Sequence, residues 1–221
     1  MIPRLRRAAV LGAGVMGSAI AAHLANAGIS VLLLDVRPSA LLDDERSRGL
    51  TLEHPQVRNR LAAAGKQRAL HAQPAAFFVP ARAQLVETGN FDDHLSRIAE
   101  VDWVLEAVIE DLPIKQQVLA QVARYWKPGT VVSTNTSGLR VREIAAGCPD
   151  ALRRHFLGTH FFNPPRYLRL LELIPLPGTD PEIVAAVSDW GDRLLGKGIV
   201  HAHDTPNFIA NRIGSYGGPF H

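Results

Sequence analysis

The chain has 221 residues, of which 47% are hydrophobic and 20% charged, and its mean hydropathy is +0.03. This composition is typical of a folded protein and excludes global disorder, the single cysteine excludes a disulfide scaffold, and no apolar run approaches the ~18 residues that span a bilayer. The net charge of +3 rests largely on scattered arginines, which argues against a nucleic-acid partner and leaves room for an anionic small molecule.

The first predicted elements form one β-α-β unit. Residues 1–7 are basic, but glycines break the apolar stretch behind them, so we see no secretory signal and expect a cytoplasmic protein. The apolar run 8–11 predicts a buried strand, and residues 15–27 predict a helix that a glycine stops. Residues 30–34 predict a second strand, with Asp35 at its end.

The next interval, residues 36–100, is long for a connection between core strands. Its patterns predict helical stretches near residues 39–50, 56–70 and 92–99. We therefore expect a helical insertion after the second strand, and such insertions tend to carry packing or function specific to one ligand.

Beyond the insertion, strands and helices alternate. The expected strands are residues 103–108, 130–133, 156–162, 168–174 and 198–201. The expected helices are residues 112–126 (apolar face Ile114, Val118, Leu119 and Val122), 140–146 and 181–195, and a last one opened by Pro206. This alternation predicts an α/β fold with a Rossmann-type, doubly wound, mainly parallel sheet.

The turn after the first strand is rich in glycine. Its residues, in order, are Gly12, Ala13, Gly14, Val15, Met16 and Gly17. A G-x-G-x-x-G run that follows a strand, opens a helix and has an acidic residue at the end of the next strand is typical of dinucleotide binding, and Asp35 meets that last condition. In this interpretation Gly12 permits the turn, Gly14 admits the pyrophosphate and Gly17 lets the helix pack closely. The alternative is three structural glycines in an ordinary turn.

Asp35 also indicates which dinucleotide is bound. Its carboxylate can accept hydrogen bonds from the adenosine ribose and repels a 2′-phosphate, so NAD is favoured over NADP. Arg37 lies two residues further on and could in principle reach a phosphate, but Asp35 is closer to the expected ribose position.

Four more motifs follow in a fixed order. They are EAVIEDLPIK at residues 106–115, NTSGL at 135–139, HFFNPP at 160–165 and DTPNFIANR at 204–212. Together with the glycine motif they resemble the L-3-hydroxyacyl-CoA dehydrogenase family, whose members act in fatty-acid β-oxidation. The resemblance runs from about residue 7 to 214 and is strongest to the dehydrogenase part of bacterial proteins fused to an enoyl-CoA hydratase.

His160 is the candidate general base and acid, because oxidation of a secondary alcohol needs a group that takes the hydroxyl proton. Taken alone, a histidine beside two phenylalanines is more often a packed strand residue. Glu172 changes that balance, since a carboxylate in an otherwise apolar strand either faces solvent or has a buried partner. A carboxylate bonded to an imidazole fixes its tautomer. The resemblance implies that these two residues form the catalytic dyad.

Other site residues are implied by the resemblance alone. It makes Ser137 a residue that bonds the substrate oxygen, and Asn211 one that places the substrate or the dyad. It puts Asn163 near the nicotinamide, and Glu110 and Lys115 at the cofactor, with Lys115 also able to reach the acyl-CoA. The alternative for Glu110 and Lys115 is an exposed charged pair at a helix start. We assign no metal site.

The chain departs from the family pattern at two positions. Gly138 stands where most members carry a second serine, and Asn207 stands where most carry a glycine. Neither position supplies an acid, base or nucleophile, so we expect altered loops rather than lost chemistry. The interval 36–100 aligns poorly with simpler members, so no CoA contact is carried over there. We interpret Cys148 as structural.

The expected activity is NAD⁺-dependent oxidation of (S)-3-hydroxyacyl-CoA to 3-oxoacyl-CoA, with an acyl-CoA as the substrate partner. Two alternatives stay open. One is a dehydrogenase of the same superfamily that acts on a hydroxy acid without CoA, and the other is a dinucleotide-binding module without turnover. Activity with and without CoA distinguishes them.

The resemblance also implies a domain division. Residues 1–205 are expected to form the NAD-binding domain, and residues 206–221 the start of a helical C-terminal domain that closes over the substrate and makes a dimer. We expect the rest of that domain to be missing from this chain, which would then bind NAD(H) but turn over little substrate by itself.

Overall fold

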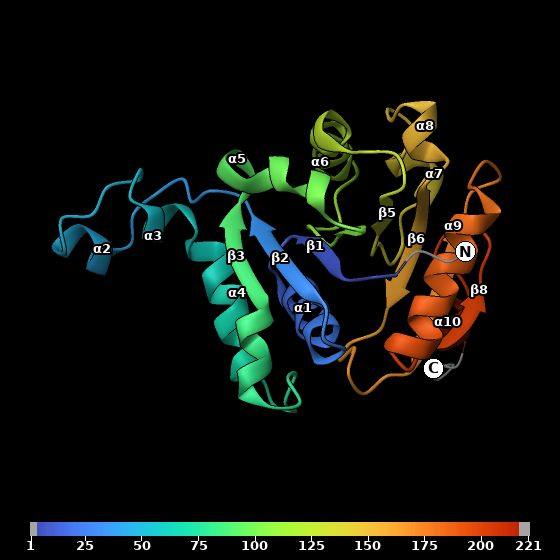
Figure 1. Cartoon of the computed structure of the whole chain (residues 1–221), viewed down its shortest axis with the longest axis horizontal. Helices are drawn as coiled ribbons and strands as arrows, with labels where there is room; N and C mark the ends of the chain where they lie inside the picture. The colour runs from blue at the N-terminus through green and yellow to red at the C-terminus, as the bar shows by residue number, and fades with distance from the viewer. Residues whose placement is uncertain (1–3, 217–221) are drawn as a thin grey trace.

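The computed structural model describes residues 4–216. Its centre is an eight-stranded sheet in the order β3-β2-β1-β4-β5-β6-β7-β8, and every neighbouring pair is parallel except β6 and β7 (Figure 1). The strands are β1 (Arg7–Leu11), β2 (Ser30–Asp35), β3 (Val86–Asn90), β4 (Trp103–Glu106), β5 (Val131–Thr134), β6 (Phe156–Phe161), β7 (Leu170–Pro175) and β8 (Gly198–His201). The predicted Rossmann-type sheet is confirmed.

Helices cover both faces of this sheet. The α-helices are α1 (Val15–Asn26), α2 (Asp43–Ser47), α3 (Pro55–Arg58), α4 (Arg60–Leu70), α5 (Phe91–His94), α6 (Leu112–Tyr125), α7 (Val141–Ile144), α8 (Asp150–Arg153), α9 (Pro181–Asp189) and α10 (Ala210–Tyr216). Two 3₁₀ helices, η1 (Pro80–Leu85) and η2 (Leu95–Glu100), and one π-helix, η3 (Trp190–Leu194), complete the described part of the chain.

Each face of the sheet has its own hydrophobic core, because successive strand residues point to opposite sides. Ala8 and Val10 of β1 pack with α1, α4 and α9, whereas Ala9 and Leu11 pack with η2, α6, α7 and α8. On the first side, Trp103 lies with its ring centre 5.8 Å from that of Trp190. The central strands are therefore buried on both faces, as their unbroken apolar runs predict.

The insertion after β2 is helical, as predicted, but it also contains a strand that the sequence analysis did not predict. β3 pairs in parallel with β2, in the register Val31↔Val86 to Asp35↔Asn90. Its sequence, VETGN, has one large apolar residue, and it lies at the sheet edge, where one backbone side has no strand neighbour. The predicted helical stretches are present, and β3 is an addition to them. α2 and α3 lie in an arm that projects beyond β3 (Figure 1).

The strand order places the candidate site. The chain moves outward from β1 to β2 and β3, and then returns to add β4 on the other side of β1. In open α/β sheets, ligands bind at the carboxyl ends of the strands where the order reverses. Here that point lies between β1 and β4. The glycine turn, Asp35 and Glu106 lie at the carboxyl ends of β1, β2 and β4 respectively. Within residues 4–216, no helix is both long enough and apolar enough to cross a membrane.

Candidate active site

The glycine turn is built by two close approaches of backbone to backbone. Gly12 has φ +101°, and a Cβ atom there would lie 2.6 Å from the carbonyl oxygen of Ala107. A Cβ atom on Gly17 would lie 1.8 Å from the carbonyl oxygen of Gly12. Around Gly14, by contrast, no described atom lies within 4 Å of the corresponding position. The first and third glycines therefore serve packing, and the middle one faces free space at the start of α1.

Asp35 is bonded to that turn. Its Oδ2 accepts a hydrogen bond from the Ala13 amide at 2.7 Å, and its Oδ1 accepts one from the Val36 amide at 2.7 Å. Its carboxylate therefore lies at the edge of the glycine turn, where the adenosine ribose of a dinucleotide is expected.

A cleft of about 470 Å³ opens beside this turn, within the range of small-molecule sites. Gly12, Gly14 and Asp35 contribute to its wall, and the rest is mostly apolar. The sequence analysis did not assign most of the apolar lining residues to the site, and these are Val36, Phe91, Ala107, Val108, Ile109, Ile114 and Val118. The sequence offered one signal, because Val36 and Ile109 are apolar residues just beyond predicted strands. The structure leaves them 52% and 66% exposed.

His160 and Glu172 lie opposite each other on the antiparallel strands β6 and β7. His160 Nδ1 is 2.7 Å from Glu172 Oε2, and both residues are buried. Because an ionised carboxylate only accepts hydrogen bonds, the pair requires the proton on Nδ1. No described residue bonds His160 Nε2, so this nitrogen is left as an acceptor.

The second oxygen of Glu172 connects the pair to α10. Oε1 accepts hydrogen bonds from the Ile209 amide at 3.0 Å and the Ala210 amide at 2.9 Å. The predicted helix at Pro206 begins later, at Ala210, because Asn207 and Phe208 have φ +64° and +45°. Asparagine tolerates this left-handed conformation better than most residues, which accounts for its presence at a position where the family usually carries glycine.

Ser137 and Asn211 meet across the site. The Asn211 side-chain amide donates to the Ser137 carbonyl oxygen at 3.3 Å. Glu110 holds the same loop, since its Oε1 accepts from the amides of Ser137 and Gly138, each at 2.9 Å, and from the Thr136 hydroxyl at 2.5 Å. Burial by itself raises the pKa of the Glu110 carboxyl, but the bonds from Thr136 and Gly138 and the charge of Lys115 outweigh it and lower the pKa.

Lys115 is only 1% exposed and turns inward. Its Nζ lies 2.8 Å from Glu106 Oε1, 3.2 Å from the Val108 carbonyl oxygen and 3.5 Å from Glu110 Oε2. The alternative of an exposed pair is therefore wrong for Lys115, because its ammonium is enclosed by these three groups. Contact of Lys115 with an acyl-CoA stays a prediction. The sequence analysis put Ile114 on the buried face of α6 with Val118, Leu119 and Val122, but the residue buried with these three is Lys115.

Within the described residues, no polar side-chain contact links Asn163 to the other candidates. It is exposed two residues beyond the end of β6, and no hydrogen bond joins its side chain to another described residue. The structure thus joins the glycine turn to Asp35, His160 to Glu172, and both Glu110 and Asn211 to Ser137, and Asn163 is bonded to none of them. Cys148 is buried, and burial raises the pKa of its thiol to about 11, as expected for an unreactive structural cysteine.

Comparisons with known proteins agree with this geometry. The model of a family described as 3-hydroxyacyl-CoA dehydrogenase, NAD binding domain, matches residues 7–205. Over 217 residues the chain is 49% identical to a probable 3-hydroxyacyl-CoA dehydrogenase of Bacillus subtilis, which covers 98% of this chain and 28% of that protein. It is also 49% identical over 214 residues to a probable 3-hydroxyacyl-CoA dehydrogenase of Deinococcus radiodurans, with 97% of this chain and 58% of that protein covered.

A solved structure gives the same result. The crystal structure of 3-hydroxybutyryl-CoA dehydrogenase from Escherichia coli superposes with a TM-score of 0.73 and 28% identity, covering 96% of this chain and 41% of that one. The chain therefore spans only part of the length of each of these three proteins.

Proposed function

The chain belongs to the 3-hydroxyacyl-CoA dehydrogenase family, and we propose that it serves the NAD⁺-dependent oxidation of (S)-3-hydroxyacyl-CoA to 3-oxoacyl-CoA in fatty-acid β-oxidation. The family match lies on the NAD-binding domain, and NAD is its cofactor. The observation that carries the proposal is the buried His160–Glu172 pair, with one imidazole nitrogen bonded to the carboxylate and the other left to accept a proton.

The residues of the cleft fit a dinucleotide. The free space at Gly14 and the N-terminus of α1 suit the pyrophosphate, because helix amides and the helix dipole favour anions. Asp35 would accept hydrogen bonds from the ribose, and the apolar walls at Val36 and Ile109 suit the flat face of an adenine. When bound, NAD⁺ supplies the acceptor for the hydride that leaves the substrate carbinol carbon.

The protein residues handle the proton. His160 Nε2 takes the hydroxyl proton of the substrate, and Glu172 stabilises the imidazolium that results. The Ile209 and Ala210 amides at the start of α10 keep Glu172 in place, so the imidazole stays aimed in one direction. Ser137 and Asn211 position the substrate oxygen, and Glu110 holds their loop through the backbone. We assign Asn163 to the nicotinamide end of the cofactor on the family resemblance.

The test measures NADH formation at 340 nm with the purified chain in excess over substrate, so that a slow single turnover is visible. The substrates are (S)-3-hydroxybutyryl-CoA, a longer acyl homologue and free (S)-3-hydroxybutyrate. We expect NADH with the CoA thioesters only. Equal reaction of the free acid would favour a dehydrogenase that needs no CoA, and NAD⁺ binding without any NADH would favour a module without turnover.

A further inference from the structure

Arg37 lies two residues beyond Asp35, but both ends of its guanidinium are occupied. Nη2 is 2.7 Å from Glu53 Oε1, and Nη1 is 3.2 Å from Asp92 Oδ2. Nε is buried and has no hydrogen-bond partner among the described residues. The position of the guanidinium is therefore set by the two carboxylates, one from the projecting arm and one from α5.

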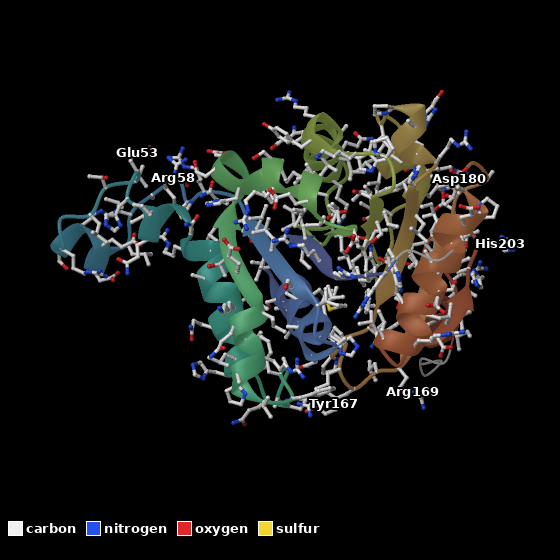
Figure 2. The ribbon with its side chains drawn as sticks, viewed as in Figure 1. Glu53, Arg58, Tyr167, Arg169, Asp180 and His203 are labelled. Atoms are coloured by element: carbon white, nitrogen blue, oxygen red, sulfur yellow. The ribbon has the colours of Figure 1, made fainter. Side chains whose placement is uncertain are left out.

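These contacts belong to a longer row of alternating charges. Glu53 also accepts from Arg58 Nη1 at 2.5 Å, and Figure 2 shows these two residues beside each other in the projecting arm. Arg58 forms a two-point contact with Asp93 at 2.6 and 2.5 Å. The order Asp92–Arg37–Glu53–Arg58–Asp93 contains three carboxylates and two guanidinium groups. The hydrogen bond from Arg37 is the main reason that the pKa of Glu53 is lowered. We name these five residues the charge row.

The place of the charge row matters because NAD and NADP differ at one group. NADP carries a phosphate on the 2′-oxygen of the adenosine ribose, and proteins that bind it place an arginine near the end of the second strand. Arginine suits this task through its planar set of N–H donors. Arg37 has the residue type and the position that such a site needs, yet its donors point at Glu53 and Asp92.

We infer that Glu53 and Asp92 are specificity-determining residues that withhold Arg37 from a 2′-phosphate. The exclusion of NADP then has two parts. Asp35 repels the phosphate directly, and the charge row, with its surplus of one negative charge, removes the cation that would compensate for it. This inference rests on the proposed cofactor site, in which Asp35 contacts the ribose.

Replacing Asp35 alone should not produce NADP⁺ binding. Replacing Asp35 removes the repulsion and the ribose contact, so NAD⁺ binding weakens. The same replacement does not create an NADP⁺ site, because Arg37 remains bound to Glu53 and Asp92. Affinity for NADP⁺ should rise when the partners of Arg37 are neutralised as well, partly with Asp92 alone and most with both carboxylates.

Calorimetric titration of the full 221-residue chain with NAD⁺ and NADP⁺ tests this directly. The variants are Asp35→Ser and Asp35→Ser/Glu53→Gln/Asp92→Asn. The triple variant should bind NADP⁺ about tenfold or more tightly than the single variant, as expected for a new charge-assisted contact. Adding Arg37→Ala to the triple variant should remove that gain.

A matched control separates this effect from a change in net charge. The variant Asp35→Ser/Asp43→Asn/Glu100→Gln loses the same number of carboxylates, but Asp43 pairs with Arg46 and Glu100 pairs with Arg7. Its NADP⁺ affinity should stay within about twofold of the Asp35→Ser value, since both pairs are exposed and lie outside the charge row.

Each outcome has a definite meaning. If the triple variant gains no more NADP⁺ affinity than the control, the inference is overturned. If Asp35→Ser changes neither titration, the proposed cofactor site is wrong instead. Should the triple variant unfold, Asp35→Ser/Asp92→Asn replaces it, because Asp92 is exposed, and an NADP⁺ gain of about threefold is then expected. No gain in that variant also overturns the inference.

Discussion

At the scale of single residues, the site depends on a carboxylate that is completely buried. Glu172 is tolerated in the core because both of its oxygens are bonded, one to His160 and one to two backbone amides. Removing one partner of a buried charge typically costs about 3–5 kcal/mol, so the pair is stable only as a complete unit. The same contacts fix which imidazole nitrogen carries the proton.

The residue-level prediction concerns His160. His160→Gln should lower turnover by about 10² to 10⁴, the usual cost of losing a general base, and leave NAD⁺ affinity within a few-fold. Single-turnover NADH formation and an NAD⁺ titration measure the two effects. His203→Gln serves as the control, because His203 is exposed and takes no part in the site (Figure 2). Turnover above a tenth of the wild-type value in His160→Gln would remove His160 from the mechanism.

At the scale of elements, the connection between β1 and α1 shows how similar residues can have different tasks. Gly17 has no room for a side chain, because its Cβ position meets the Gly12 carbonyl oxygen. Gly14 has room for a side chain in the free protein, so packing does not require a glycine there, whereas the proposed cofactor does. A side chain at Gly17 should therefore lower stability, whereas a side chain at Gly14 should weaken cofactor binding.

Gly17→Ala should lower the free energy of unfolding by about 3 kcal/mol, because overpacking forces the backbone apart. Gly14→Ala should change it by about 1 kcal/mol or less, yet weaken NAD⁺ binding at least about tenfold, since the methyl group occupies space that the pyrophosphate needs. Urea unfolding and NAD⁺ titration check both. Gly147→Ala is the control, as its Cβ position is also open. Equal effects at Gly14 and Gly147 would contradict the assignment.

The ends of β4 and β5 and the start of α6 are joined by a buried ion pair. Glu106 accepts hydrogen bonds from Lys115 at 2.8 Å, from the Val108 amide at 2.7 Å and from the Thr134 hydroxyl at 2.5 Å. Lys115 in turn faces Glu110, which holds the Ser137 loop. The ammonium of Lys115 therefore helps to hold together β4, β5, α6 and the loop that contains Ser137.

Lys115→Met should lower the free energy of unfolding by about 3–5 kcal/mol, because it leaves the Glu106 charge buried without a cation. Glu106→Gln/Lys115→Met should recover part of that loss, since neither charge is then left alone. Urea unfolding of both single variants and the double variant gives the coupling energy. Strict additivity of the two losses would show that the pair does not act as a unit.

At the scale of the whole molecule, the fold buries ionisable groups that come from distant segments. His23 of α1 lies with Nε2 3.0 Å from the Leu195 carbonyl oxygen, and its Nδ1 has no partner among the described residues. Burial, followed by the charge of Lys197, lowers the pKa of His23 from 6.5 to about 4. Lys197 itself is buried against the carbonyl oxygens of Pro165 and Leu168, and burial lowers its pKa to about 8.

This arrangement predicts a pH dependence of stability. Between pH 6.5 and about 4 the unfolded chain binds a proton at His23 and the folded chain does not, so stability falls as the pH is lowered through this window. The contribution of His23 should be fully present above pH 6.5. From pH 7 to about 4.5, His23→Gln should lose roughly 2–3 kcal/mol less unfolding free energy than wild type. Urea unfolding at both pH values checks this, and identical losses would contradict it.

The sequence by itself determined the local units of this protein. The β-α-β unit at the N-terminus could be predicted because the glycine turn, α1 and Asp35 lie within about 30 residues of one another. Over such a short range the residue types themselves indicate which backbone conformations are needed. The alternating apolar runs predicted the fold class for the same reason. The order of the motifs was enough to identify the family.

Tertiary structure alone decided the rest, because the deciding contacts join residues far apart in the chain. β3 forms a strand because its backbone pairs with the edge of β2. Lys115 can be buried because its ammonium forms an ion pair with Glu106. Arg37 resembles a phosphate ligand in the sequence, but Glu53 and Asp92 occupy its donors in the fold. Local patterns indicate which contacts a residue type can make, and long-range packing decides which partners lie close enough to make them.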